Sequence, residues 1–246
     1  MIRNGVLLLL FLFSAVSVGK FCIKQTDGFT ISSILSSRDN NPAWETRPLS
    51  SEEKREVKIA LDKKYHYFGC GGQSYIFFSD DEKSVLKVFK QEKFQLPFWM
   101  RVFHIPVLLE RYREKKIWGR KDKLSRDFTS YKVAFDELQE ETGLVYVHLN
   151  KSDHLHKKIT LIDRLNISHQ VDLDTLDFVI QKRGELVYER ITRLMQEGKQ
   201  HEAKNAISQI IHLIVTRCQK GYHDRDPNIR TNCGFIEDRA VKIDVG

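Results

Sequence analysis

A glycine cluster is the first feature of this sequence that could take part in chemistry. Gly69, Gly71 and Gly72 lie in the stretch YHYFGCGGQSYIFF, between an aromatic run and a strand-like run. Glycine lets a backbone turn tightly and bring its N–H groups close to an anion, which a bulkier residue would prevent. A hairpin also uses glycines for its turn geometry. The cluster is therefore compatible with phosphate binding and with a plain turn.

Lys87 is the second such feature, and it follows shortly after the glycines. In the run VLKVF, the alternation of a strand places Lys87 on the same face as Val85 and Phe89. A cation on an apolar, inward face needs an anionic partner. The alternative is an edge strand whose lysine extends to solvent. We interpret Lys87 as a contact for an anion that the glycines would cradle.

The elements that must position these residues alternate between strand and helix patterns. The strand patterns are SYIFF, SVLKVF, GLVYVHL and KKITLID. Residues 125–143 predict an amphipathic helix with an apolar stripe of Phe128, Tyr131, Phe135 and Leu138. Two further helices are predicted over 175–196 and 200–220, followed by a polar loop and a short strand pair. The pattern predicts an α+β fold.

This order of elements, with DRDPNIRTN after the last helix and KIDVG after the next strand, resembles the protein-kinase-like fold family over roughly residues 65–246. The resemblance implies a two-lobed fold. Residues 56–170 would form the small lobe, an antiparallel sheet with one helix and an insertion at 91–124. Residues 171–246 would begin a helical large lobe that carries the catalytic loop, with DVG in place of DFG.

The resemblance also implies a chemistry, in which ATP and Mg²⁺ are the cofactors and a hydroxyl of a protein Ser/Thr, a sugar or another small molecule is the acceptor. A transferring phosphoryl group calls for Mg²⁺ held by oxygen ligands, a cation on the phosphates and an acceptor for the hydroxyl proton. The implied roles are Gly69, Gly71 and Gly72 over the phosphates, Lys87 on the α- and β-phosphates, Asp226 as the catalytic base, and Asn232 and Asp244 as metal ligands.

Several residues depart from the family pattern. Asn232 stands one position later than the family's asparagine, so Thr231 occupies the expected place and Asn228 is a rival ligand. Asp224 replaces the usual histidine and is a rival base. The family also continues through an activation segment and further helices after this motif, and this sequence does not. A fragment of a longer chain, a truncated gene and a minimal natural version are the three explanations.

The predicted helix offers no clean acidic partner for Lys87. Glu137 and Glu140 point away from its apolar stripe, Glu141 lies at the flank, and Asp127 lies nearer the middle. The pairing acid comes from elsewhere, the helix is rotated, or the site is degenerate. A non-catalytic, pseudokinase-like binding module is therefore the main alternative to an enzyme.

The N-terminus differs in composition from the predicted folded domain. Arg3 precedes the apolar run VLLLLFLFSAVSV and the small Gly19, which is typical of a signal peptide over 1–19. A short signal-anchor is the alternative. Secretion or membrane association is the expected localisation. Residues 20–55, rich in Ser, Asp, Asn and Pro around TRPLSSEEKRE, predict a mobile lead-in.

The insertion over 91–124 mixes aromatic and basic residues, in a chain whose formal net charge is +7. We expect a helical hairpin with its Phe and Trp inward and its Lys and Arg solvated. The alternative is a basic peripheral-membrane protein that uses 91–124 as its contact surface; nucleic acid is a less favoured partner. Four scattered cysteines and histidines without zincin spacing predict neither a disulfide framework nor a histidine metal site.

Overall fold

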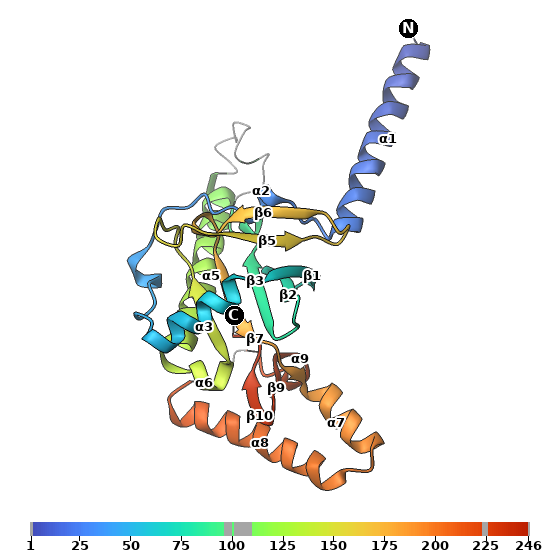
Figure 1. Ribbon diagram of the computed structural model, residues 1–246. Helices are drawn as coiled ribbons and strands as arrows, with labels where there is room; N and C mark the ends of the chain where they lie inside the picture. Colours follow the sequence, from blue (N-terminus) through green and yellow to red (C-terminus); the bar gives the residue numbers. More distant parts are fainter. Residues whose placement is uncertain (1, 96–99, 101–109, 223–225, 246) are drawn as a thin grey trace.

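The computed structural model describes residues 2–95, 100, 110–222 and 226–245. Seven strands form one curled sheet in the order β4-β7-β3-β2-β1-β5-β6 (Figure 1). Every neighbouring pair is antiparallel except β1 and β5. The strands are β1 Lys64–Cys70, β2 Ser74–Ser79, β3 Ser84–Phe89, β4 Leu144–His148, β5 Lys158–Ile162, β6 Ser168–Asp172 and β7 Phe178–Lys182. Helices accompany the sheet, so the α+β prediction is confirmed.

Helices cover both faces of the central strands. The helix α5, Glu110–Glu137, packs its predicted stripe of Phe128, Tyr131 and Phe135 against Phe89 of β3. The helix α3, Ser51–Leu61, packs with Leu86 and the other inward residues of the opposite face. A short helix, α6 Gln139–Thr142, connects α5 to β4. Because β3 is buried along its whole length, its lysine is held inside the protein.

The segment before α3 belongs to the packed structure, which corrects the predicted mobile lead-in. It contains α2, Ile31–Ile34, and the 3-10 helix η1, Pro42–Trp44. Phe29 and Ile34 are buried in the cluster beneath α3, and Trp44 packs edge-on against Phe128 of α5. The prediction of mobility was based on the polar composition of the segment and gave no weight to its few large apolar residues. The burial of these residues holds the segment against the sheet.

The helix predicted over 175–196 is wrong in its first half. Residues Phe178–Lys182 form β7 in the middle of the sheet, and only Val187–Gln196 form a helix, α7. Phe178 and Ile180 face the cluster under α3, whereas Val179 faces α5. A strand buried on both faces reads as a short continuous apolar run, which periodicity cannot distinguish from a helix.

The remaining elements form a second group below the sheet in Figure 1. The predicted helix over 200–220 is confirmed as α8, Gln200–Gln219. It packs with α7 and with a three-stranded sheet of order β10-β9-β8. The strands of this small sheet are β8 Glu185–Leu186, β9 Cys233–Ile236 and β10 Arg239–Lys242, and the short helix α9, Ile229–Asn232, leads into β9.

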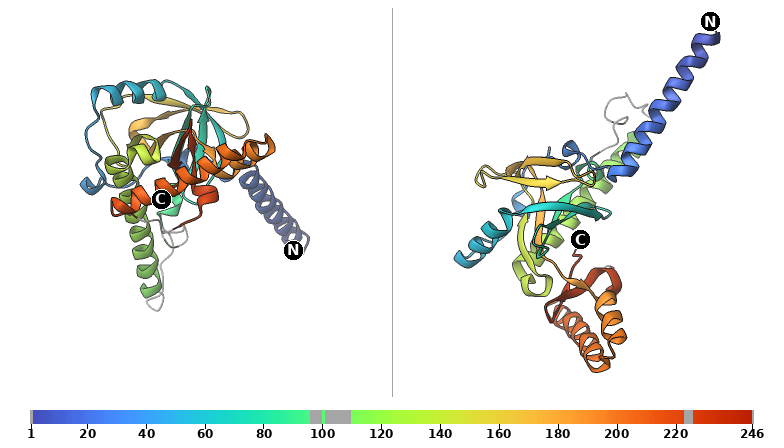
Figure 2. Two further views of the ribbon diagram at one scale, coloured as in Figure 1. Left: turned by 90° about the horizontal axis from the view of Figure 1, so that it is seen from below. Right: turned by 45° about the vertical axis from the view of Figure 1, so that its right-hand side comes forward.

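The N-terminal helix α1, Ile2–Thr26, extends away from the rest of the protein (Figure 2). A search of the described residues found no helix that is long and apolar enough to cross a membrane. The signal-peptide and localisation predictions remain predictions.

The insertion over 91–124 is described only in part, because 96–99 and 101–109 lie outside the described residues. Its C-terminal portion is the first half of α5, so that helix begins well before the predicted residue 125. Phe94 is buried, as the hairpin interpretation expected, but Trp118 is 70% exposed, which contradicts the expected inward orientation of the tryptophans. The many charged residues of α5 keep this half of the helix in solvent.

Position 234 in β9 has room only for glycine, because the backbones of β8 and β9 approach each other closely there. A Cβ atom at this position would lie 2.6 Å from the carbonyl oxygen of Glu185 in the paired strand β8. We expect Gly234→Ala to lower the free energy of unfolding by about 1–3 kcal/mol, as overpacking does elsewhere. Denaturant unfolding would measure it. Gly119→Ala is the matched control, because Gly119 is exposed on α5 with open space around it, and this change should stabilise the helix slightly.

Candidate functional site

Lys87 lies in the interior, on the face of β3 that meets α5. Its side chain is only 6% exposed, and its Nζ donates a hydrogen bond to the backbone oxygen of Ile243, at 2.7 Å. Burial lowers the pKa of the Lys87 ammonium, and the negative charge of Asp244 opposes this shift. Lys87 of β3 therefore lies beside residues Ile243 and Asp244, which follow the last strand.

Asn232 joins the two acidic residues that the sequence singled out. Its Nδ2 donates to Oδ2 of Asp226 at 2.9 Å, and its backbone oxygen accepts from the N–H groups of Ile243 and Asp244, at 2.7 and 3.3 Å. Asn232 is buried at the end of α9, just before β9 turns away. It thus fixes both the loop that carries Asp226 and the segment after β10.

A polar cavity of ≈ 760 Å³ lies between α5 and these segments. Asp226, Asn232 and Asp244 all line it, together with Asp127 of α5 and Gln73 of the β1–β2 connection. Lys87 reaches the edge of this group through Ile243. The structure therefore brings together Lys87, Asp226, Asn232 and Asp244, although they come from elements far apart in the sequence.

Gly69 lies near the end of β1, and Gly71 and Gly72 lie in the β1–β2 connection, where Lys90 contacts Gly71. Lys90 is buried, its Nζ donates to the backbone oxygen of Gly71 at 2.9 Å, and it lies 4.6 Å from the ring centroid of Tyr75. None of Gly69, Gly71 and Gly72 has a positive φ, so left-handed geometry does not require glycine here. A Cβ at Gly69 or Gly72 would meet nothing within 4 Å. The glycines provide open space, and they do not themselves line the cavity.

Asp127 is the acid of α5 that faces the cavity. It is buried, and its Oδ2 has no hydrogen-bond partner in the described part of the chain. Burial raises the pKa of Asp127; the positive charges of Lys123 and Arg126 oppose the rise, and the negative charge of Asp244 adds to it. Of the other acids considered from the sequence, Glu141 forms an ion pair with Lys220. Between Lys87 and the described acids of α5 there is no ion pair.

The rival residues are placed differently. Asp224 lies outside the described residues. Thr231, which occupies the family's asparagine position, donates its hydroxyl to Oδ1 of Asn232 at 2.9 Å and so orients the neighbouring amide. Asn228 is exposed and is absent from the cavity lining. Asn232, which stands one position later than the family's asparagine, is therefore the residue that lines the cavity, and Asn228 and Thr231 do not.

The oxygen donors of this cavity fit a metal that arrives with its ligand. In the described residues, no group of three or more His, Cys, Asp and Glu side chains could hold a metal ion. Asp244 supplies a carboxylate, and Oδ1 of Asn232 supplies an amide oxygen. Mg²⁺ is usually bound by one or two carboxylates together with substrate phosphates and water. This donor set suits such a shared site.

Several residues at or near the site were not singled out from the sequence, among them the buried Lys242, which lines the cavity and donates to the backbone oxygen of Asp226 at 3.4 Å. Lys90 supports the glycine connection, and Gln73 links that connection to the cavity. The sequence does show that Lys90 lies close to Lys87. It does not show that Lys90 contacts Gly71, because that contact depends on the pairing of β2 with β3. Comparisons of this chain with protein-family models, with curated proteins and with solved structures found no match, so the interpretation of the site depends on its own geometry.

Proposed function

We propose that the cavity beside α5 binds Mg·ATP and that the protein transfers a phosphoryl group to a hydroxyl acceptor, in a protein-kinase-like arrangement. The observation that carries this proposal is that Asp226, Asn232 and Asp244 line one cavity, while the buried Lys87 ammonium is bonded to Ile243, next to Asp244. The order of elements also supports it, because the glycine hairpin, the lysine strand, α5 and the β9–β10 hairpin follow one another as in the kinase signature.

Each residue has a role that its position favours. The Lys87 ammonium would offset phosphate charge, and its burial strengthens that interaction because the surroundings screen it weakly. Asp244 and Asn232 would hold Mg²⁺, whose bound form neutralises charge on the phosphates. Asp226, oriented by the amide of Asn232, would accept the proton of the acceptor hydroxyl. The family resemblance supplies the substrate class, and the acceptor is a protein Ser/Thr, a sugar or another small molecule.

A non-catalytic nucleotide-binding or partner-binding module is the second candidate. One observation favours it: the Lys87 ammonium is bonded to the backbone oxygen of Ile243, and α5 offers it no ion pair within the described residues. In active kinases the corresponding lysine pairs with a glutamate of the helix. A measurement of nucleotide binding separately from turnover distinguishes the two candidates.

The test of the proposed site is thermal unfolding with and without Mg·ATP. Binding at a ligand concentration 100 times Kd stabilises the folded state by about 2.7 kcal/mol. For a chain of this size that corresponds to a rise in Tm of roughly 5–10 °C. We expect Lys87→Met to weaken binding at least about tenfold, because a charge-assisted contact to phosphate is lost.

Lys204→Met is the matched control for this experiment, because Lys204 is exposed on α8, away from the cavity. It should leave the Mg·ATP shift unchanged, and chelation of Mg²⁺ should reduce the shift. An unchanged Tm of the wild-type protein at millimolar Mg·ATP would contradict nucleotide binding and leave partner binding as the remaining function of the module.

A further inference from the structure

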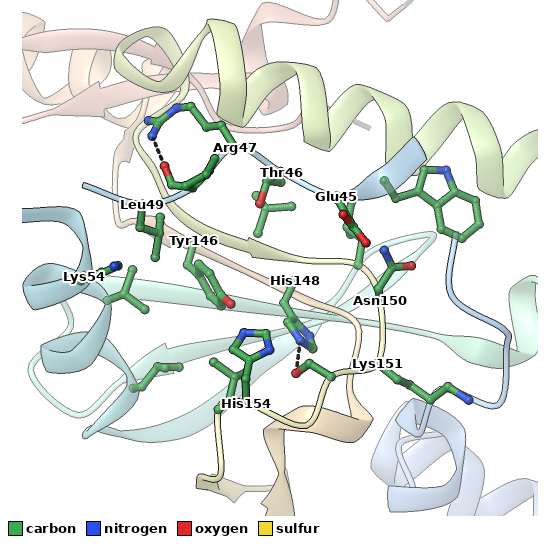
Figure 3. Close-up of a pocket in the computed structure, with 18 of the residues that line it drawn as sticks. Glu45, Thr46, Arg47, Leu49, Lys54, Tyr146, His148, Asn150, Lys151 and His154 are labelled. Atoms are coloured by element: carbon green, nitrogen blue, oxygen red, sulfur yellow. Dashed lines mark hydrogen bonds between the residues drawn. The ribbon is translucent and has the colours of Figure 1, made fainter. Parts of the chain in front are cut away.

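A second cavity lies on another part of the molecule, between β4 and the N-terminal segment that crosses it (Figure 3). It measures ≈ 820 Å³ and shares no lining residue with the cavity beside α5. Its walls are residues 44–49 and α3 on one side, and β4 with the loop over 149–157 on the other. A pocket of this size is within the range that binds small molecules.

Apolar and aromatic side chains form its floor. Leu49, Val57 and Leu155 pack against the core cluster beneath the pocket. The rings of Tyr146, His148 and His154 gather at its centre in Figure 3. The floor therefore suits the apolar or aromatic body of a ligand.

Tyr146 presents an unpaired hydroxyl to this pocket. The side chain is 8% exposed, and its hydroxyl has no hydrogen-bond partner in the described part of the protein. Burial, helped by the negative charge of Asp174, raises the pKa of Tyr146 to about 12, so the hydroxyl keeps its proton near neutral pH. Because the hydroxyl is open to the pocket, it can donate a hydrogen bond to a ligand acceptor there.

The charges around the pocket favour an anion. Of its basic residues, Arg47 pairs with Glu53, and Lys157 pairs with Asp62. Lys54, Lys58 and Lys151 form no ion pair with any described residue, and Glu45 and Asp153 are the acids that line the pocket. The pocket is lined by five basic and two acidic residues; with Glu53 and Asp62, the partners of Arg47 and Lys157, included, five positive and four negative charges leave a net formal charge of +1.

His148 and Ser152 line the pocket and lie near Asp174, but among the described residues these three are not arranged as a hydrolytic triad. Nδ1 of His148 faces the backbone oxygen of Leu176 at 2.8 Å, and its Nε2 lies 2.9 Å from Oγ of Ser152. Asp174 accepts from Ser152 and not from His148. A catalytic aspartate would instead orient the histidine. The hydrogen bonds of this group hold the loop over 149–157 in place.

We propose that this second pocket binds a small organic anion, a phosphate or carboxylate group carried on an apolar or aromatic body, with Tyr146 and Lys54 as its polar contacts. The acidic group would accept from the Tyr146 hydroxyl and the Lys54 ammonium, and the body would lie on the aromatic floor. The inference is independent of the nucleotide proposal, because the two cavities share no residues.

The experiment is isothermal titration of the full chain with four probes: phenyl phosphate, laurate below its micelle concentration, inorganic phosphate and benzyl alcohol. Phenyl phosphate or laurate should bind saturably. Inorganic phosphate, which lacks the body, and benzyl alcohol, which lacks the charge, should each bind at least about tenfold more weakly. Stronger binding of laurate would indicate a lipid-derived ligand and stronger binding of phenyl phosphate a soluble metabolite; both support the proposal.

Two conservative variants locate the binding. Tyr146→Phe and Lys54→Met should each weaken binding of the better probe about tenfold or more, since each removes a hydrogen bond to a charged group. Tyr188→Phe and Lys204→Met change the same residue types on α7 and α8, outside the pocket, and should leave the affinity unchanged. No saturable binding of phenyl phosphate or laurate, or equal affinity in all four variants, would overturn the proposal.

Discussion

Asp226→Asn is expected to lower the rate of ADP formation from Mg·ATP by about 10²–10⁴-fold, the usual contribution of a general base. The substitution keeps the size of the side chain, and its own amide oxygen can accept the hydrogen bond that Asn232 now donates at 2.9 Å. The loop and the cavity should therefore persist, while the group that accepts the hydroxyl proton is lost. The rate should be measured with water as the acceptor and with candidate hydroxyl acceptors.

Nucleotide binding provides the control for this variant. Asp226→Asn should keep the thermal shift with Mg·ATP, so that loss of turnover is separated from loss of binding. Asp224→Asn, made in parallel, should have the smaller effect. If Asp226→Asn turns over at the wild-type rate and Asp224→Asn does not, the base has been assigned to the wrong aspartate. If neither variant nor the wild-type protein forms ADP while ATP still binds, the non-catalytic module is the better description.

Arg38→Ala is expected to lower the free energy of unfolding by about 3–5 kcal/mol, the usual cost of removing one partner of a buried ion pair. Arg38 pairs with Asp177, which is fully buried and also accepts from Nε2 of Gln91 at 2.7 Å. The Arg38 guanidinium also lies 4.6 Å from the ring centroid of Phe128 on α5. Its loss would leave the Asp177 carboxylate buried without its cation and weaken the attachment of the N-terminal segment, which Phe29, Ile34 and Trp44 would still anchor.

The double variant Arg38→Met, Asp177→Leu tests the cause of this destabilisation. It removes both charges and leaves similar side-chain volumes, but it also removes the acceptor of the buried Gln91 amide, so it should recover part of the stability that Arg38→Ala loses. Denaturant unfolding monitored by circular dichroism would give the free energies. An Arg38→Ala protein as stable as the wild type would show that the pair contributes little and that apolar packing alone holds the segment.

The N-terminal segment and the second pocket show where sequence patterns stop being informative. The polar composition of the N-terminal segment predicted mobility. In the structure Phe29, Ile34 and Trp44 anchor the segment, and Arg38 pairs with Asp177, far along the chain. No local pattern marks those partners, because each contact joins residues that are distant in sequence. The pocket beside β4 depends on the same crossing, so it too could not be predicted.

Short runs of apolar and aromatic residues bounded by turn signals were sufficient to predict the strands around SYIFF, SVLKVF, GLVYVHL and KKITLID. Helical periodicity predicted the apolar stripe of α5, and the apolar neighbours of Lys87 predicted its inward position. Tertiary structure decided the rest. It made 178–182 a central strand instead of a helix, since burial on both faces removes the period that identifies a strand. It also brought Asn232, Asp226 and Asp244 to one cavity and Lys87 to the backbone of Ile243 beside Asp244, because pairing and packing between distant segments set those distances.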